Sequence, residues 1–262
     1  MNYHKKHLQG SKRMTRKYKK ALPSLALFAG TVCSFSIISV RITGMAAWLL
    51  FITGLSLYNL VKEYGQIQKK DILTGSILSF LVLPDNAILS IVVFLAFLSA
   101  MTILHGTTNP IPFFSTDKAN SKSQSCKTLF CLGIGIVLAL VNVFLAAGLT
   151  PSHPGWKLSY LFSALQAGIF EEICFRLFLF AWTMRLYGNR SFTYLDNFLI
   201  YIILVLPHVL LHFPQTMDLM SILILSLLFG LPFSMMMRKV NLLSAIGAHT
   251  IIDLIRFIIL GG

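Results

Sequence analysis

Three ionisable residues stand close together in an otherwise apolar stretch, AGIFEEICFRLF at residues 167–178. They are Glu171, Glu172 and Arg176. Each charged residue at the centre of a membrane helix costs about 2.5–3.5 kcal/mol, so three unpaired charges would cost roughly 7–10 kcal/mol. Pairing, hydration or a function must offset that cost. On a helix, Glu172 and Arg176 share a face and can form an ion pair, whereas Glu171 is rotated by about 100° and points elsewhere.

Two further apolar segments carry ionisable residues one helical turn apart. LPHVLLHFPQ contains His208 and His212, and AIGAHTIIDLIRF contains His249 and Asp253. An Asp one turn from a His can orient the imidazole and accept its second N–H. A single buried His is most often a structural residue. Three histidines, with carboxylates and arginines, on three apolar segments instead indicate an intramembrane functional site.

The elements that must position these residues are membrane helices. The chain has 262 residues, of which 56% are hydrophobic and only 12% charged, against roughly 25% charged in a soluble domain. Several apolar runs approach or exceed the ~18 residues that indicate a transmembrane helix. We therefore expect an all-α, polytopic transmembrane bundle of about eight or nine spans, with the polar motifs on its C-terminal helices. The candidate spans cover residues 21–40, 45–61, 68–83, 87–104, 128–148, 158–187, 198–213, 219–237 and 242–260.

Charge and polarity divide the chain into four parts. Residues 1–20 form a basic tail without any acidic residue, 21–104 are N-terminal transmembrane helices, 105–127 are a polar loop, and 128–262 carry the motifs. The basic clusters fall on one side of the membrane if 66–104 crosses twice, which favours nine spans over eight. Lys and Arg collect on the cytoplasmic side, so we expect an integral, multi-pass plasma-membrane protein with a cytoplasmic N-terminus.

The net charge of +13 does not indicate a nucleic-acid partner, because eight of the 22 basic residues lie in the N-terminal tail. That tail is expected to meet anionic membrane lipid. The four cysteines match neither a zinc-binding pattern nor a disulfide framework. The expected partners are membrane lipid and a membrane-associated peptide or protein substrate, and the sequence does not define an oligomeric state.

The three polar segments together resemble the motifs of a known family. EEICFR fits the EExxxR signature of the CAAX-protease and bacteriocin-processing (CPBP, or Abi) family of intramembrane endopeptidases, which includes type II CAAX prenyl proteases. LLHFP is similar to the family's FxxxH motif, and AHTIID to its HxxxN/D motif; the three occur in family order. In the second motif His208 stands where Phe is expected, so either His212 or His208 is the motif histidine, and the HFP context favours His212.

This resemblance implies a reaction and a role for each residue. Glu171 would act as general base and, with the second-motif histidine, would activate a water that attacks a peptide carbonyl. His249 and Asp253 would stabilise the tetrahedral oxyanion. Glu172 and Arg176 would hold the base and the helices in register. The mechanism that the family favours requires no cofactor.

Three alternatives stay open on the sequence alone. A metal-dependent version would use Glu171, His212 and His249 as Zn²⁺ ligands, with water in the fourth position. Carboxylates, histidines and arginines inside a helical bundle also serve proton-coupled transporters, whose sites often lie at broken helices. A non-catalytic immunity or scaffold protein of the same fold is the third alternative. The substrate itself could be a prenylated tail, a peptide precursor or a membrane segment.

Overall fold

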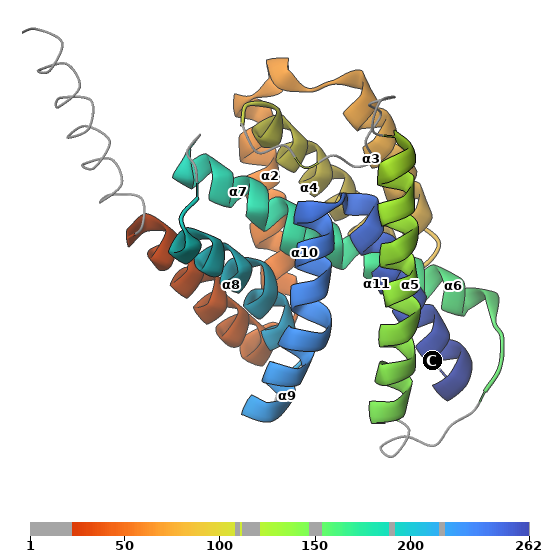
Figure 1. Cartoon of the computed structure of the whole chain (residues 1–262). Coiled ribbons are helices and arrows are strands. Elements are labelled where there is room, and N and C mark those ends of the chain that lie inside the picture. The colour runs from red at the N-terminus through yellow and green to blue at the C-terminus, as the bar shows by residue number, and fades with distance from the viewer. Residues whose placement is uncertain are drawn as a thin grey trace, which may run out of the picture.

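The structure is a computed structural model that describes residues 23–107, 111, 121–146, 154–188, 192–214 and 218–261. These residues form a helical bundle without any strand, as Figure 1 shows, which confirms the all-α prediction. The basic tail 1–20 and most of the polar loop 105–127 lie outside the described residues.

A helix at Pro23–Ile42 precedes the labelled elements. These are α2 (Ala46–Lys62), η1 (Tyr64–Gln66), α3 (Lys69–Val82), α4 (Ala87–His105), α5 (Ser121–Ala146), α6 (Leu158–Glu171), η2 (Glu172–Leu177), α7 (Phe178–Tyr187), α8 (Tyr194–Leu211), α9 (Leu219–Leu225), η3 (Ser226–Gly230), α10 (Leu231–Lys239) and α11 (Leu242–Leu260). α5 begins at Ser121, so the last seven residues of the stretch expected to be loop are helical.

Six of the helices that the structure describes are long and apolar enough to cross a membrane. They are Pro23–Ile42, Ala87–His105, Ser123–Ala146, Tyr194–Leu211, Leu219–Lys239 and Leu242–Leu260. α3 has 14 residues and is therefore about 21 Å long, less than the ~30 Å of a hydrocarbon core. The choice between eight and nine crossings stays a prediction.

The helix boundaries follow from local chemistry. Pro84, Asp85 and Asn86 separate α3 from α4, as their turn-forming character predicts. The Asn86 side chain accepts hydrogen bonds from the backbone N–H groups of Ile88 and Leu89, which caps α4. Between α7 and α8, Thr193 and Asp196 form a capping box at the start of α8.

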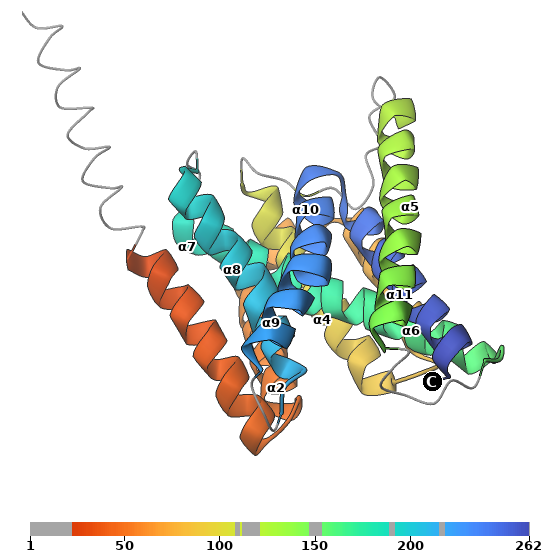
Figure 2. The ribbon, with the colours of Figure 1, turned by 60° about the horizontal axis from the view of Figure 1, so that its bottom comes forward.

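Helix α11, which carries two of the motif residues, packs closely against α5 and α6. A Cβ atom at Gly168 in α6 would lie 2.3 Å from Thr250 Oγ1, and one at Gly135 in α5 would lie 2.9 Å from Ala248 Cα. Glycine is therefore needed at both positions for this backbone approach. Figures 1 and 2 both show α11 beside α5 and α6.

The helix that holds the EExxxR motif contains a π-helical turn. Residues 158–187 form one rod in which α6 passes through η2 into α7, and η2 begins at Glu172. A second π turn, η3, precedes Pro232 near the start of α10. Pro232 has no N–H to donate, so the helix must change its hydrogen-bond register there. π turns inside α-helices are frequent at functional sites.

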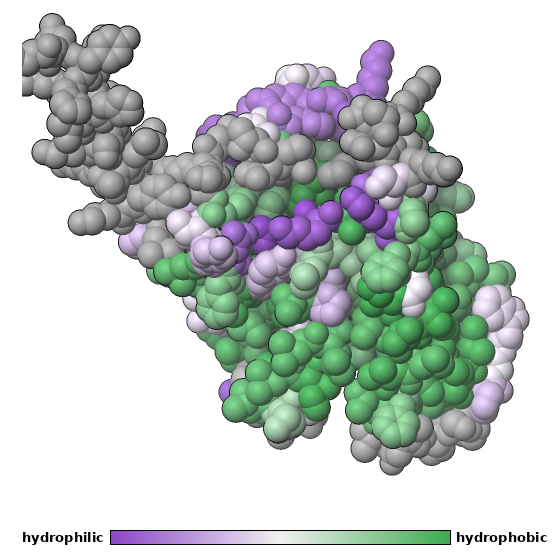
Figure 3. Space-filling view, in the orientation of Figure 1, coloured by the Kyte–Doolittle hydropathy of each residue, from purple (hydrophilic) through white to green (hydrophobic). Residues whose placement is uncertain are grey.

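The N-terminal helices pack directly against the motif-bearing helices. α4 contacts α7 and η2, and α3 contacts α6. Trp48 of α2 is fully buried and meets Phe175 of η2 edge to face, with ring centroids 5.2 Å apart. The space-filling view shows apolar residues over the lower face and hydrophilic residues gathered toward the opposite end (Figure 3). This distribution fits a bundle that lies in a bilayer.

Candidate active site

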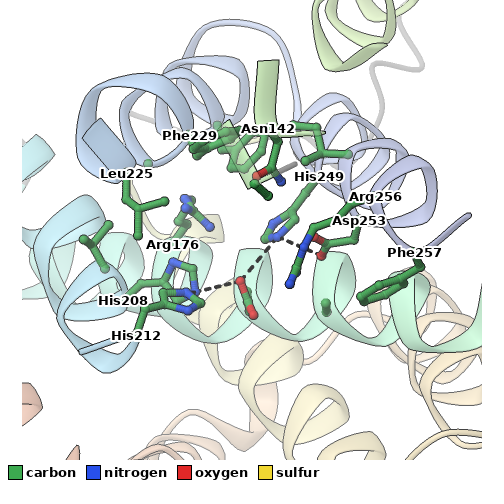
Figure 4. A pocket seen from close by; sticks show the side chains of 17 residues that line it. Asn142, Arg176, His208, His212, Leu225, Phe229, His249, Asp253, Arg256 and Phe257 are labelled. Atoms are coloured by element: carbon green, nitrogen blue, oxygen red, sulfur yellow. Dashed lines mark hydrogen bonds and ion pairs between the residues drawn. The ribbon is translucent and has the colours of Figure 1, made fainter. Parts of the chain in front are cut away.

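A cavity of about 400 Å³ lies between α5, α6, α8, η3, α10 and α11. Its walls include six of the seven ionisable residues that the sequence singled out, which are Glu171, Arg176, His208, His212, His249 and Asp253. The seventh, Glu172, is fully buried behind the cavity wall. Figure 4 shows His208 and His212 on one side of the cavity, with His249 and Asp253 on the other. The structure therefore brings all seven residues together.

Glu172 and Arg176 form the ion pair that their spacing predicts. Arg176 Nη1 donates to Glu172 Oε1 over 2.6 Å, and both side chains are at most 1% exposed. The same oxygen lies 2.8 Å from His249 Nδ1, so the pair also ties η2 to α11. The Arg176 guanidinium stands 5.3 Å from the centroid of the Phe233 ring. Glu172 Oε1 thus has a cationic partner and a histidine partner, which offset part of the cost of burying the charge, whereas Glu172 Oε2 has no hydrogen-bond partner among the described residues.

Glu171 has a different environment, although it is the adjacent residue. Its Oε2 atom lies 2.6 Å from His208 Nε2 and 3.4 Å from His249 Nε2. Its side chain is 19% exposed and lines the cavity. The carboxylate is therefore held between two imidazoles and still has access to the cavity, where a water or a substrate group could meet it.

His208 is the α8 histidine within hydrogen-bond distance of Glu171, whereas the HFP context favours His212 as the motif histidine. α8 ends at Leu211, which leaves His212 exposed at the helix cap. His208 lies one turn deeper, where it is buried and its ring packs 5.3 Å from that of Phe175. His212 Nε2 reaches His208 Nε2 over 3.3 Å. The depth of each histidine in α8 therefore decides which one meets the carboxylate.

His249 is fixed from both sides by carboxylates. Its Nδ1 faces Glu172, and its Nε2 lies 3.4 Å from Asp253 Oδ2 and at the same distance from Glu171 Oε2. The ring also stacks on Phe233, with centroids 4.7 Å apart and planes inclined by 11°. Asp253 thus orients the imidazole in the way that the i, i+4 spacing predicts.

Several residues of the site were not singled out from the sequence. Phe233 contacts both His249 and Arg176, but in the sequence it looks like any other apolar core residue. Asn142 and Arg256 also line the cavity. Both are polar residues in apolar helices, and that is the signal by which they could have been found.

Three of the residues offer donor atoms at metal-binding separation. One ligand atom from each of Glu171, His208 and His212 can be chosen so that all three lie within 4.8 Å of one another. The set expected from the sequence contained His249 in place of His208. Both His249 nitrogens face carboxylate oxygens: Nδ1 lies 2.8 Å from Glu172 Oε1, and Nε2 lies 3.4 Å from Glu171 Oε2 and from Asp253 Oδ2.

A family model described as Rce1-like type II CAAX prenyl endopeptidase matches residues 153–255. This segment is similar to that endopeptidase family. The matched segment runs from before α6 into α11, so it includes all seven ionisable residues that the sequence singled out. No curated protein and no solved structure matches the chain. With six long apolar helices among the described residues and this similarity, the protein is an integral membrane protein.

Proposed function

We propose that the protein is an intramembrane endopeptidase that hydrolyses a peptide bond with a water activated by Glu171 and His208. The observation that carries the proposal is the position of the Glu171 carboxylate. It is held 2.6 Å from an imidazole and lines a cavity within an apolar bundle. The family match of the surrounding helices favours a hydrolase over a transporter or a scaffold protein.

The reaction requires one proton to move twice. Glu171 Oε2 takes a proton from the water while the water oxygen bonds to the carbonyl carbon, and the carbonyl oxygen becomes an oxyanion. Collapse of this intermediate breaks the C–N bond, and Glu171 returns the proton to the departing amine. His208 donates its Nε2–H to Glu171 and so keeps the carboxylate aimed at the water.

The oxyanion requires a hydrogen-bond donor in the cavity. His249 Nε2 is the donor in the proposed mechanism, because it is an N–H within 3.4 Å of Glu171 Oε2. Asp253 is a carboxylate and can only accept, so it contributes by orienting His249 and not by direct contact with the oxyanion. Glu172 Oε1 lies 2.8 Å from the other ring nitrogen of His249, Nδ1, and orients the ring from that side. No step of this mechanism needs a metal or an organic cofactor.

The substrate class follows from the lining and the surroundings of the cavity. Apolar side chains of Leu225, Phe229, Ile252 and Phe257 contribute to its walls. Such walls accommodate an apolar or lipid-modified chain better than a polar peptide. We therefore propose a membrane-associated peptide, of the prenylated type for which the matching family is named.

The proposed location is the plasma membrane, with the N-terminus in the cytoplasm. The α2–α3 junction, the start of α5 and the end of α10 carry basic residues, and all three lie toward the upper end of the bundle in Figure 1. Lys and Arg favour the cytoplasmic side. Cysteine labelling at positions 11 and 121 from one side of the membrane tests this arrangement; opposite accessibility of the two positions would contradict it.

The test of the function is cleavage of matched peptides by the purified full-length protein in lipid vesicles. One peptide carries a farnesylated cysteine three residues from its C-terminus, and the other has the same sequence without the lipid. We expect the wild type to cleave the farnesylated peptide in the presence of EDTA. Glu171→Gln should cleave it at least ~100-fold more slowly, the scale of lost general-base catalysis. Glu63→Gln, a carboxylate outside the cavity, is the control. Equal cleavage by wild type and Glu171→Gln would refute the proposed role.

A further inference from the structure

The cavity contains a cation that the proposed mechanism does not use. Arg256 of α11 is exposed and lines the cavity, and Figure 4 shows it beside Asp253, on the same side as His249. We propose that the Arg256 guanidinium binds the C-terminal carboxylate of the peptide substrate and so decides which peptide bond lies at Glu171. This subsite deepens the proposed function and rests on it.

Arg256 differs from the other arginine of the cavity in its partners. Arg176 is 1% exposed and pairs with Glu172. The Arg256 guanidinium has no hydrogen-bond or ion-pair partner among the described residues, and its Cζ atom lies 5.7 Å from the centroid of the Phe257 ring. Ionisable residues that face a cavity inside a membrane bundle mark the path of a substrate or an ion. A free guanidinium at this place therefore indicates an anionic group on the substrate.

The neighbouring carboxylate does not neutralise Arg256. Asp253 precedes Arg256 by three residues, so the two lie near one face of α11. Asp253 Oδ2 faces His249 Nε2 over 3.4 Å, and Glu171 Oε2 lies at the same distance from that nitrogen. These two carboxylates repel the carboxylate of a substrate from the reacting end of the cavity, while Arg256 attracts it. The charges thus orient the peptide as well as bind it.

The spacing between Arg256 and the proposed oxyanion donor fits a fragment of three residues. His249 and Arg256 are seven residues apart in one continuous α-helix, so they share a face and lie about 10.5 Å apart along its axis. Three residues of an extended peptide span about 10–11 Å. A peptide that places its scissile carbonyl at His249 and runs along α11 therefore brings its C-terminal carboxylate to Arg256 when three residues follow the scissile bond.

A guanidinium suits this ligand because of its shape. Its planar N–H groups can donate two parallel hydrogen bonds to one carboxylate, and its charge strengthens both. A C-terminal amide has nearly the same shape as the carboxylate, but it is neutral and turns an NH₂ group toward the guanidinium. Arg256 should therefore distinguish a free C-terminus from an amidated one, whichever side chains the last three residues carry.

The test compares two farnesylated peptides, each with three residues after the cysteine, that differ only in a free or an amidated C-terminus. Full-length protein in phosphatidylcholine vesicles should cleave the free acid with a kcat/KM ~10–100-fold above that of the amide, the scale of hydrogen bonds to a charged group. Arg256→Gln should abolish this preference. Arg41→Gln, which changes an exposed arginine outside the cavity, should keep it.

A third peptide tests the spacing. A free acid with four residues after the cysteine carries its carboxylate about 3.3–3.6 Å too far along α11. We expect cleavage after the cysteine to be as slow as in the amide. Equal cleavage of the three-residue and four-residue tails at that bond would contradict the fixed distance between Arg256 and His249.

A binding measurement separates the subsite from catalysis. Fluorescence titration of Glu171→Gln with labelled peptides measures affinity without efficient cleavage. The free acid should bind ~10–100-fold more tightly than the amide, and addition of Arg256→Gln should remove the difference. If the wild type cleaves no peptide, the proposed function fails, and this titration alone decides whether the carboxylate subsite exists.

Two results would overturn the subsite. One is equal binding of the free acid and the amide by Glu171→Gln, or a preference for the free acid that survives Arg256→Gln. The other is a loss of cleavage in Arg256→Gln by the same factor for both peptides, since Arg256 would then support the helix or reach lipid head groups and would not read the substrate terminus.

Discussion

The bundle contains two carboxylate–histidine pairs of equal length in two different regions. In the N-terminal helices, Asp71 Oδ2 of α3 lies 2.6 Å from His105 Nε2 of α4. In the motif-bearing helices, Glu171 Oε2 of α6 lies 2.6 Å from His208 Nε2 of α8. The exposure is reversed between them. The Asp71 side chain is 6% exposed and its histidine 20%, whereas Glu171 is 19% exposed and its histidine 9%.

The neighbours of the two pairs differ as well. In the N-terminal region, the Asn59 side chain is buried and donates to Ser99 O and to Thr102 Oγ1. Glu171, in contrast, shares its oxygen with a second imidazole and lines a cavity of about 400 Å³. A short ion pair within a membrane bundle is therefore not a sign of function by itself. The sign is a carboxylate that keeps access to a cavity while several donors converge on it.

The largest effect is expected from the buried pair that supports the site. Glu172→Gln leaves the Arg176 charge in a fully buried position, and breaking one partner of such a pair costs about 3–5 kcal/mol. The expected result is a marked fall in melting temperature in a detergent thermal-shift assay. The double variant Glu172→Leu with Arg176→Met removes both charges and should melt above the single variant. A single variant as stable as the wild type would show that the pair does not support the fold.

The next effect distinguishes the two histidines of α8. His208→Ala removes the contact with Glu171 and should slow cleavage by ~100-fold or more, equivalent to about 2.7 kcal/mol of activation free energy. His212→Ala should slow it by less than about tenfold, because His212 touches His208 and stands at the mouth of the cavity. Rate measurements on both variants in EDTA test this order. A greater loss in His212→Ala would restore the assignment that the HFP context favours.

The smallest effect concerns the ring that packs on the site. Phe233→Leu removes the ring stacked on His249 and lying over Arg176, and such an aromatic contact contributes about 0.5–1.5 kcal/mol. We expect a cleavage rate several-fold below that of the wild type, with KM nearly unchanged, because the oxyanion donor is less well oriented. Phe97→Leu, in the core of the N-terminal region, is the matched control and should lower stability alone. Equal cleavage rates in the two variants would contradict a positioning role for Phe233.

Hydropathy and helical spacing were enough to predict the bundle, the positions of its helices and the Glu172–Arg176 pair. These features depend on local sequence, since residues four apart share a helix face wherever the helix lies. The choice between His208 and His212 depends on where α8 ends and on how deep each ring lies against Phe175. Those facts depend on contacts between helices, as does the place of Phe233. The π turn that begins at Glu172 could not be predicted either, because it is six residues long and so short a segment does not reveal a change in helical period.

The most direct test of the central claim compares Glu171→Gln with Asp71→Asn, each of which replaces a carboxylate by its amide in one of the two regions. Cleavage of the farnesylated peptide and the melting temperature are measured for both purified proteins. Glu171→Gln should lose at least ~100-fold in cleavage and melt near the wild type. Asp71→Asn should cleave at the wild-type rate but lose about 1–3 kcal/mol of stability, the cost of a weakened buried hydrogen bond. Full cleavage by Glu171→Gln, or loss of cleavage in a stable Asp71→Asn protein, would contradict the account.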